Sequence, residues 1–206
     1  MESAGDAASL YARFASWRAA RPATTTLVGV LTTTFVVQSL VWWLFGFPTM
    51  AFWFAASADP SPGWLLAPLG HQSVGHLFGN LLFLVVFGSL AEADLSAPTW
   101  YWLFASSALA GTAAQVWSYL LMGVEGGAVG ASAGVVALVA FVAVRTVRDG
   151  PAARSAGVYA VGLAGGIGMV SLLFTDFVLT AGAGSAEYAH LIGVAVGGFA
   201  GLYVRG

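Results

Sequence analysis

The chain has 206 residues, of which 59% are hydrophobic and only 8% are charged, and its formal net charge is −2. So few charges cannot cover a soluble globule of this size without leaving large apolar patches exposed. The composition therefore excludes a soluble protein, a nucleic-acid-binding protein and a disordered chain, and it indicates an integral membrane protein. The absence of cysteine excludes disulfides, thiolate metal sites and cysteine nucleophiles.

Six apolar stretches are long enough to be transmembrane helices, which need roughly 20 residues to cross the hydrocarbon core. They run approximately over residues 24–47, 73–91, 98–122, 131–147, 156–180 and 186–204. We therefore expect an all-α membrane protein, with an N-terminal segment at residues 1–23 and a single six-helix membrane domain at residues 24–206.

The connections between these stretches differ in character. Residues 48–70 are rich in proline, tryptophan and phenylalanine, which predicts short helices lying at the membrane surface. Residues 123–130 form a glycine-rich loop, and residues 148–154 form a short polar turn. No internal repeat is visible, so the sequence gives no support to an inverted-repeat transporter.

The arginines predict the orientation in the membrane. With six spans, all seven arginines fall on one side, because they precede the first span, flank the turn between the fourth and fifth, and follow the sixth at Arg205. Positive charge marks the cytoplasmic side, so both termini should be cytoplasmic. The composition, with arginine but no lysine and much Ala and Gly, is typical of a GC-rich prokaryote, which indicates a prokaryotic plasma membrane.

The three histidines lie at or near membrane spans, where ionisable groups are candidates for function. His71 and His76 lie at the start of the second span, and His190 lies a few residues into the sixth, all toward the outer half. Asn80 follows His76 by one helical turn, so the two share a helix face. His71 lies five residues from His76, about 140° around the helix, so it does not easily share a site with it.

A serine is expected to face one of these histidines. Ser132 opens the fourth span, which is short enough to place it below the outer surface, level with His190. Small residues around Ser132, together with Gly193 and Gly197 on the sixth span, allow these two helices to approach closely. A serine within hydrogen-bond reach of a histidine is an activated nucleophile.

No acidic residue is clearly placed to complete a triad. Asp176 lies near the outer end of the fifth span, and Glu187 lies one turn before His190. We interpret the pattern as a Ser-His dyad with Glu187 as a candidate for a third role. His76 and Asn80 are then candidate donors to a developing oxyanion, together with the Ser132 backbone N–H.

At this point the sequence resembles the rhomboid family of intramembrane serine proteases, on three motifs in the order of the family. Residues 71–80, with His71, His76 and Asn80, match HxxxxHxxxN on the second helix, and Glu92 at its end fits a residue that the family often carries. Residues 130–132 match GxS at the start of the fourth helix. Residues 189–197 match AH…G…G on the sixth, so the resemblance extends over all six helices.

The resemblance implies a role for each matched residue. Ser132 would be the nucleophile, His190 the general base, and His76 and Asn80 the lining of the oxyanion hole, with His71 supporting the site at its mouth. Residues 48–70 would be the membrane-embedded first loop, and the fifth span a mobile gate. The substrates would be transmembrane proteins within the bilayer, and the reaction would require neither cofactor nor metal.

The chain departs from the family pattern in two places. The family usually has glycine directly after the serine, whereas Ala133 stands here and adds a methyl group near the seam of the fourth and sixth helices. The first loop also lacks a Trp-Arg pair that is common in the family, because Phe54 follows Trp53 and Leu65 follows Trp64. These departures concern substrate range and loop packing more than the chemistry.

Other interpretations of the same residues remain open. Ser132 alone is equally a packing residue at a helix seam, and His190 alone an interhelical hydrogen-bonding residue. A three-histidine metal site is possible in principle. The main alternative is an inactive rhomboid-like protein that binds membrane helices, although such proteins usually lack the complete dyad. A transporter or channel would instead need a polar path through the whole membrane, and the polar residues cluster in one half.

Overall fold

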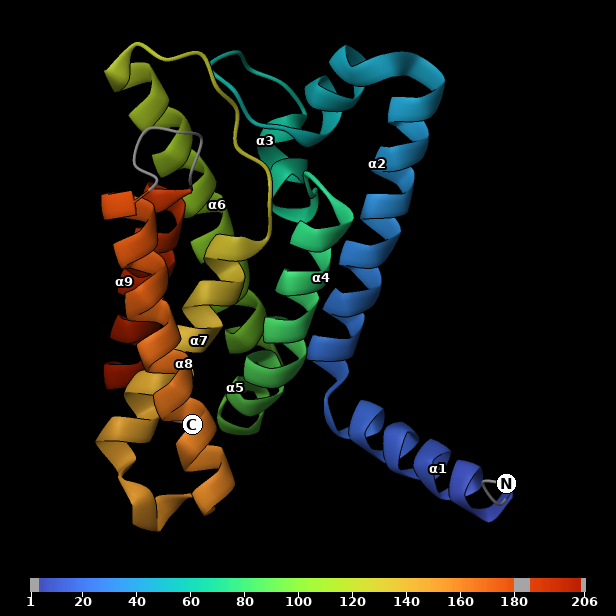
Figure 1. Ribbon diagram of the computed structural model, residues 1–206, viewed down its shortest axis with the longest axis vertical. Coiled ribbons are helices and arrows are strands. Elements are labelled where there is room, and N and C mark those ends of the chain that lie inside the picture. The colour runs from blue at the N-terminus through green and yellow to red at the C-terminus, as the bar shows by residue number, and fades with distance from the viewer. Residues whose placement is uncertain (1–3, 180–185, 205–206) are drawn as a thin grey trace.

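Helices cover all six expected stretches in the computed structural model, which describes residues 4–179 and 186–204 (Figure 1). The main helices are α2 (Pro22–Phe54), α4 (Val74–Phe83), α6 (Ala97–Met122), α7 (Ser132–Asp149), α8 (Ala156–Phe174) and α9 (Glu187–Tyr203). The second span continues from α4 through a π-helical turn, η2 (Leu84–Gly88), into α5 (Ser89–Asp94). The fifth continues from α8 into a π-helical turn, η4 (Thr175–Leu179). Its expected end at Thr180, and Arg205, lie outside the described residues.

The exposed surface of the bundle is apolar, as expected for contact with lipid. Within the described part of the chain, three helical stretches are long and apolar enough to cross a membrane, at Pro22–Phe54, Val74–Asp94 and Ala156–Leu179. Large apolar side chains such as Trp43, Phe45 and Leu121 are more than half exposed. In water such a surface would drive aggregation, so the structure agrees with an all-α membrane bundle.

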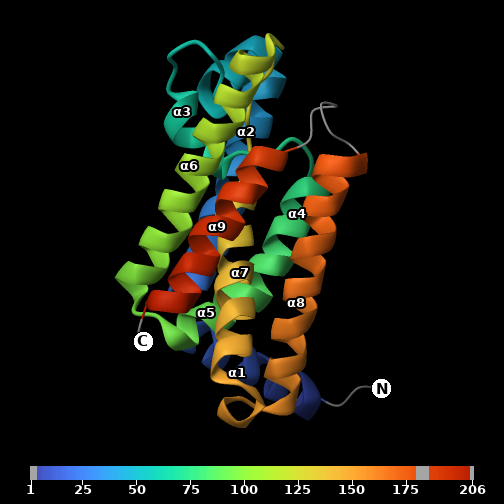
Figure 2. The same ribbon diagram turned by 90° about the vertical axis from the view of Figure 1, so that its left-hand side faces the viewer.

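Helix α7 forms the centre of this bundle, surrounded by α4, α6, α8 and α9 (Figure 2). All of its residues from Ala133 to Ala143 are buried. A β-carbon on Gly193 would lie 2.4 Å from the Ala133 carbonyl oxygen, and one on Gly197 would lie 2.1 Å from that of Ala137. The α9 backbone therefore lies directly on the α7 backbone, which confirms the expected glycine seam.

The methyl group of Ala133 does not point into this seam. It faces Gly111 of α6, where an added β-carbon would lie only 2.5 Å away. A glycine on the third span thus leaves room for the alanine that stands where the family usually has glycine. The seam between α7 and α9 is unaffected.

The N-terminal segment contains a helix that the sequence did not predict. Helix α1 (Ala4–Ala20) points away from the bundle, and α2 begins directly after it at Pro22 (Figure 1). The Glu92 carboxylate accepts hydrogen bonds from the backbone N–H groups of Ala23 and Thr24, at 2.7 and 2.9 Å, and from the Thr24 hydroxyl at 2.7 Å. This residue therefore caps the first transmembrane helix from the end of the second.

The first loop contains the short helices that its composition predicts. Gly46, with φ +82°, turns α2 sharply, and the helix then continues to Phe54. Two more short helices follow, α3 (Gly63–Leu66) and the 3₁₀ turn η1 (Ala67–Leu69). Ala56 forms a two-way backbone pair with Ala128, and the Gly130 N–H donates to the Ala67 carbonyl at 2.9 Å. The first loop thus fixes the glycine-rich loop that leads into α7.

Candidate active site

A cavity of about 490 Å³ lies between α4, α7, α8 and α9, and it brings four of the predicted site residues together. Ser132, His190, His76 and Asn80 all line this cavity. The rest of its wall is mainly small or apolar: Gly75, Gly79, Phe83, Val135, Val136, Val139, Gly165, Gly168, Met169, Ser171, Leu172 and Thr175. The site is therefore a polar cluster at one end of an apolar chamber.

Ser132 is held at the first position of α7 by the turn that precedes it. Gly130 has φ +140°, a conformation that side chains other than hydrogen rarely allow. A β-carbon there would lie 2.8 Å from Cε1 of His76 and 3.8 Å from Oγ of Ser132. The positive φ and the close approach of the backbone to the His76 ring together favour glycine here, and this approach places the ring and the Ser132 hydroxyl around the same point.

His76 and Asn80 share the inner face of α4, as their spacing predicts. Ser73 caps this helix, since its hydroxyl accepts a hydrogen bond from the His76 N–H at 3.1 Å. The Asn80 amide nitrogen donates to the His76 carbonyl at 3.1 Å. An asparagine amide has two N–H donors, so one remains for a group in the cavity.

His190 lies one turn into α9, and two contacts fix its position. The side-chain oxygen of Gln115 on α6 accepts hydrogen bonds from the N–H groups of Tyr188 and Ala189, at 3.2 and 3.3 Å, and so caps α9. The Nδ1 atom of the His190 ring lies 2.6 Å from Oδ2 of Asp176. In the described part of the chain no hydrogen bond joins His190 to Ser132, although both line the cavity.

The sequence analysis named Glu187 as the candidate for a third role beside Ser132 and His190. The structure corrects this expectation, because the carboxylate that contacts His190 is that of Asp176. Asp176 and Gln115 both contact α9, and the sequence analysis assigned neither of them a role. An aspartate in an otherwise apolar span is itself a signal of function. Its contact with His190 could not be predicted from residue spacing, because the two residues lie on different helices.

His71 lies beside the site without lining the cavity. Helix α4 begins only at Val74, so the helical angle between His71 and His76 does not apply, and their rings meet edge to face at 5.1 Å between centroids. Gln38 of α2 holds the His71 backbone by two hydrogen bonds, of 2.7 and 2.9 Å. Burial, with a smaller contribution from the nearby His76, lowers the pKa of His71 from 6.5 to about 4.

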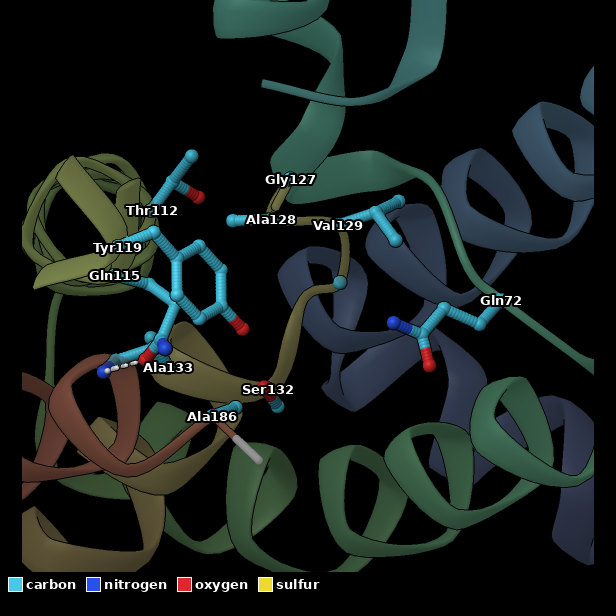
Figure 3. A pocket seen from close by; sticks show the side chains of 12 residues that line it. Gln72, Thr112, Gln115, Tyr119, Gly127, Ala128, Val129, Ser132, Ala133 and Ala186 are labelled. Atoms are coloured by element: carbon cyan, nitrogen blue, oxygen red, sulfur yellow. Dashed lines mark hydrogen bonds between the residues drawn. The ribbon is translucent and has the colours of Figure 1, made fainter. Parts of the chain in front are cut away.

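A second, smaller pocket of about 40 Å³ is also lined by Ser132 (Figure 3). Thr112, Gln115 and Tyr119 from α6 approach it on one side, and Gln72 approaches from the other. A cavity of this size and polarity has room for water. Ser132 therefore lines both the apolar chamber and this polar pocket.

Comparison with known proteins places these features in a family. The sequence model of the Rhomboid domain matches residues 62–206, which include Ser132, His190, His76, Asn80 and Asp176. A search of curated proteins found no match.

Proposed function

Because the chain belongs to the rhomboid family, whose members are generally intramembrane serine proteases, we propose that it is an intramembrane serine endopeptidase. It cleaves peptide bonds in or near the transmembrane segments of membrane proteins. The observation that carries this proposal is the meeting of Ser132, His190, His76 and Asn80 around one cavity within a membrane bundle.

The proposed reaction is acyl transfer through Ser132. His190 takes the proton of the Ser132 hydroxyl, and the oxygen attacks the scissile carbonyl carbon. The charge that develops on the carbonyl oxygen is held by His76, the second N–H of Asn80 and the Ser132 backbone N–H. His190 then gives its proton to the leaving amine. The apolar surroundings strengthen each of these interactions.

Deacylation requires water, and the small polar pocket that Ser132 also lines supports a path for it (Figure 3). Substrate would come from the lipid side, between α4 and α8, since both helices line the larger cavity. We propose that α8 moves to admit it. Its few buried residues, Gly162 and Gly165 within Ala156–Phe174, support this role, because a helix with little buried surface separates easily.

The arginines support an orientation with the site toward the outer face. Arg145 and Arg154 lie at the α7–α8 turn, where they pair with Asp149 and Asp94, at the end of the bundle that also carries α1 (Figure 2). We propose that this end is cytoplasmic, in the plasma membrane of a prokaryote. His190 and Ser132 then lie in the outer half of the bilayer.

The alternative function is that of a rhomboid-like protein that binds membrane helices without cleaving them. The missing hydrogen bond between Ser132 and His190 is the observation in its favour. However, catalytic hydrogen bonds are often long without substrate and tighten when it binds. The two functions share the cavity and differ in whether Ser132 is nucleophilic.

Cleavage in lipid distinguishes them. The purified protein is reconstituted with a generic single-span substrate beside the variants Ser132→Ala, His190→Ala and Ser106→Ala, the last on α6 outside the cavity. We expect cleavage by the wild type and by Ser106→Ala, and loss of at least about 10³-fold in the other two. Cleavage that survives Ser132→Ala contradicts the nucleophile. No wild-type cleavage of several substrates, with intact helix binding, favours the alternative.

A further inference from the structure

The contact between Asp176 and His190 joins the fifth and sixth spans. Oδ2 of Asp176 lies 2.6 Å from Nδ1 of His190, and the side chains are only 9% and 12% exposed. Other residues of this stretch, such as Phe174, Val178 and Leu179, are well exposed. Asp176 therefore points inward from a lipid-facing segment.

A buried carboxylate in a membrane span is costly, and it persists where a partner or a function requires it. Asp176 lies in the π-helical turn η4 (Thr175–Leu179), of which it is the buried residue. This turn directly follows the last residues of α8. Here the turn directs the carboxylate toward the ring of the proposed base.

We infer that Asp176 is a positioning residue for His190, so that this chain uses a Ser-His-Asp arrangement and not a dyad. The inference rests on the proposed function. With Nδ1–H donating to the ionised Asp176, the lone pair of the ring lies on Nε2, the atom available to Ser132. When Nε2 takes the Ser132 proton, the carboxylate stabilises the resulting imidazolium. Asp176 stays ionised, and the proton leaves from Nε2 to the amine of the product.

A purely mechanical role for the pair predicts a different outcome. If the contact only held α8 against α9, its loss would loosen the helix that we propose moves for substrate, and cleavage would become faster. If Asp176 orients His190, its loss slows the chemical step. The sign of the rate change therefore separates the two roles.

The kinetic test uses Asp176→Asn and Asp176→Ala in the full-length protein in lipid. Asparagine keeps the shape, but its amide N–H₂ favours a proton on Nε2, which is the wrong tautomer for a base. We expect kcat to fall at least about tenfold in both variants with KM little changed. We also expect kcat to be no higher in Asp176→Asn than in Asp176→Ala. Glu125→Gln, an acid-to-amide change in the exposed outer loop, and Val178→Ala, in the same turn, are controls expected to keep wild-type rates. An unchanged or raised kcat in Asp176→Asn overturns the inference.

The tautomer of His190 gives a second readout that does not require activity. In ¹⁵N-histidine-labelled protein, with the His190 signals assigned by their loss in His190→Gln, we expect a protonated Nδ1 and an unprotonated Nε2 in the wild type. Asp176→Asn should shift the proton toward Nε2. An unchanged tautomer in this variant overturns the inference. Cleavage that depends on Ser132 but is unchanged in the Asp176 variants likewise overturns only the inference. The absence of any wild-type cleavage overturns the proposed function.

Discussion

Ala133 of α7, which departs from the family motif, packs its methyl group against Gly111 of α6. Two substitutions can move this methyl group from α7 to α6. A β-carbon on Gly111 would lie 2.5 Å from that of Ala133, where carbon atoms need about 3.5–4.0 Å. Gly111→Ala therefore forces the helices apart by about 1 Å. We expect it to lower the free energy of unfolding by up to about 2 kcal/mol, which is the usual cost of overpacking less the gain in helix propensity.

Removing the opposing methyl group should restore most of this loss. Ala133→Gly alone should cost about 1 kcal/mol, but in Gly111→Ala/Ala133→Gly the new methyl group occupies the space of the old one. The rescue is partial because the new β-carbon still lies 3.1 Å from the Ala189 carbonyl oxygen. We expect a coupling energy of at least about 1 kcal/mol.

The measurement is unfolding of the four proteins in mixed detergent micelles, followed by circular dichroism. Gly29→Ala is the matched control, because a β-carbon there meets nothing within 4 Å. Additive effects of the two changes, or a Gly111→Ala protein as stable as Gly29→Ala, would refute the packing argument.

Three further predictions concern the cap of α2, the turn before α7 and the burial of His71. Glu92→Gln should lower the free energy of unfolding by about 1.5–3 kcal/mol in the same assay, since it weakens charge-assisted bonds to the Thr24 hydroxyl and the α2 backbone; a stable variant would refute the capping role. Gly130→Ala should abolish cleavage while the helix content is retained, because its β-carbon displaces the His76 ring; normal kcat would contradict this. His71 has a lowered pKa of about 4, so only the unfolded chain takes up its proton between pH 6.5 and 4. The free energy of unfolding should fall by up to about 3 kcal/mol as pH falls through this window, and it should fall less in His71→Phe. An identical dependence on pH in the two proteins would exclude a contribution from His71.

The positions of the helices follow from sequence because length and apolarity decide them. The main differences arise where local rules compete. The sequence analysis ended the first span near residue 47, since Pro48 breaks a helix. In the structure Gly46 has φ +82° and makes the turn, and Pro48 then falls in the first turn of the next helical segment, where its missing N–H is not needed. Helix α1 was not expected because its mixed polarity gives no buried face.

The candidate site was predictable only in part, for a similar reason. Spacing on one helix fixes which residues share a face, so His76 and Asn80 were assigned together. The approach of Ser132 to the same cavity followed from glycines that allow close packing. Asp176 and Gln115 contact α9 from other helices, and no spacing within one helix reports such a contact. The position of His71 depended on where α4 begins, which is a boundary that sequence patterns locate poorly.

Covalent labelling of Ser132 tests the central claim most directly. The protein in lipid is treated with a fluorophosphonate, which reacts only with an activated serine, and the adduct is located by mass spectrometry of its peptides. The account predicts one adduct, on Ser132, which is lost in His190→Ala and retained in Ser106→Ala. An adduct on another serine, no adduct at all, or equal labelling of Ser132 in His190→Ala would contradict it.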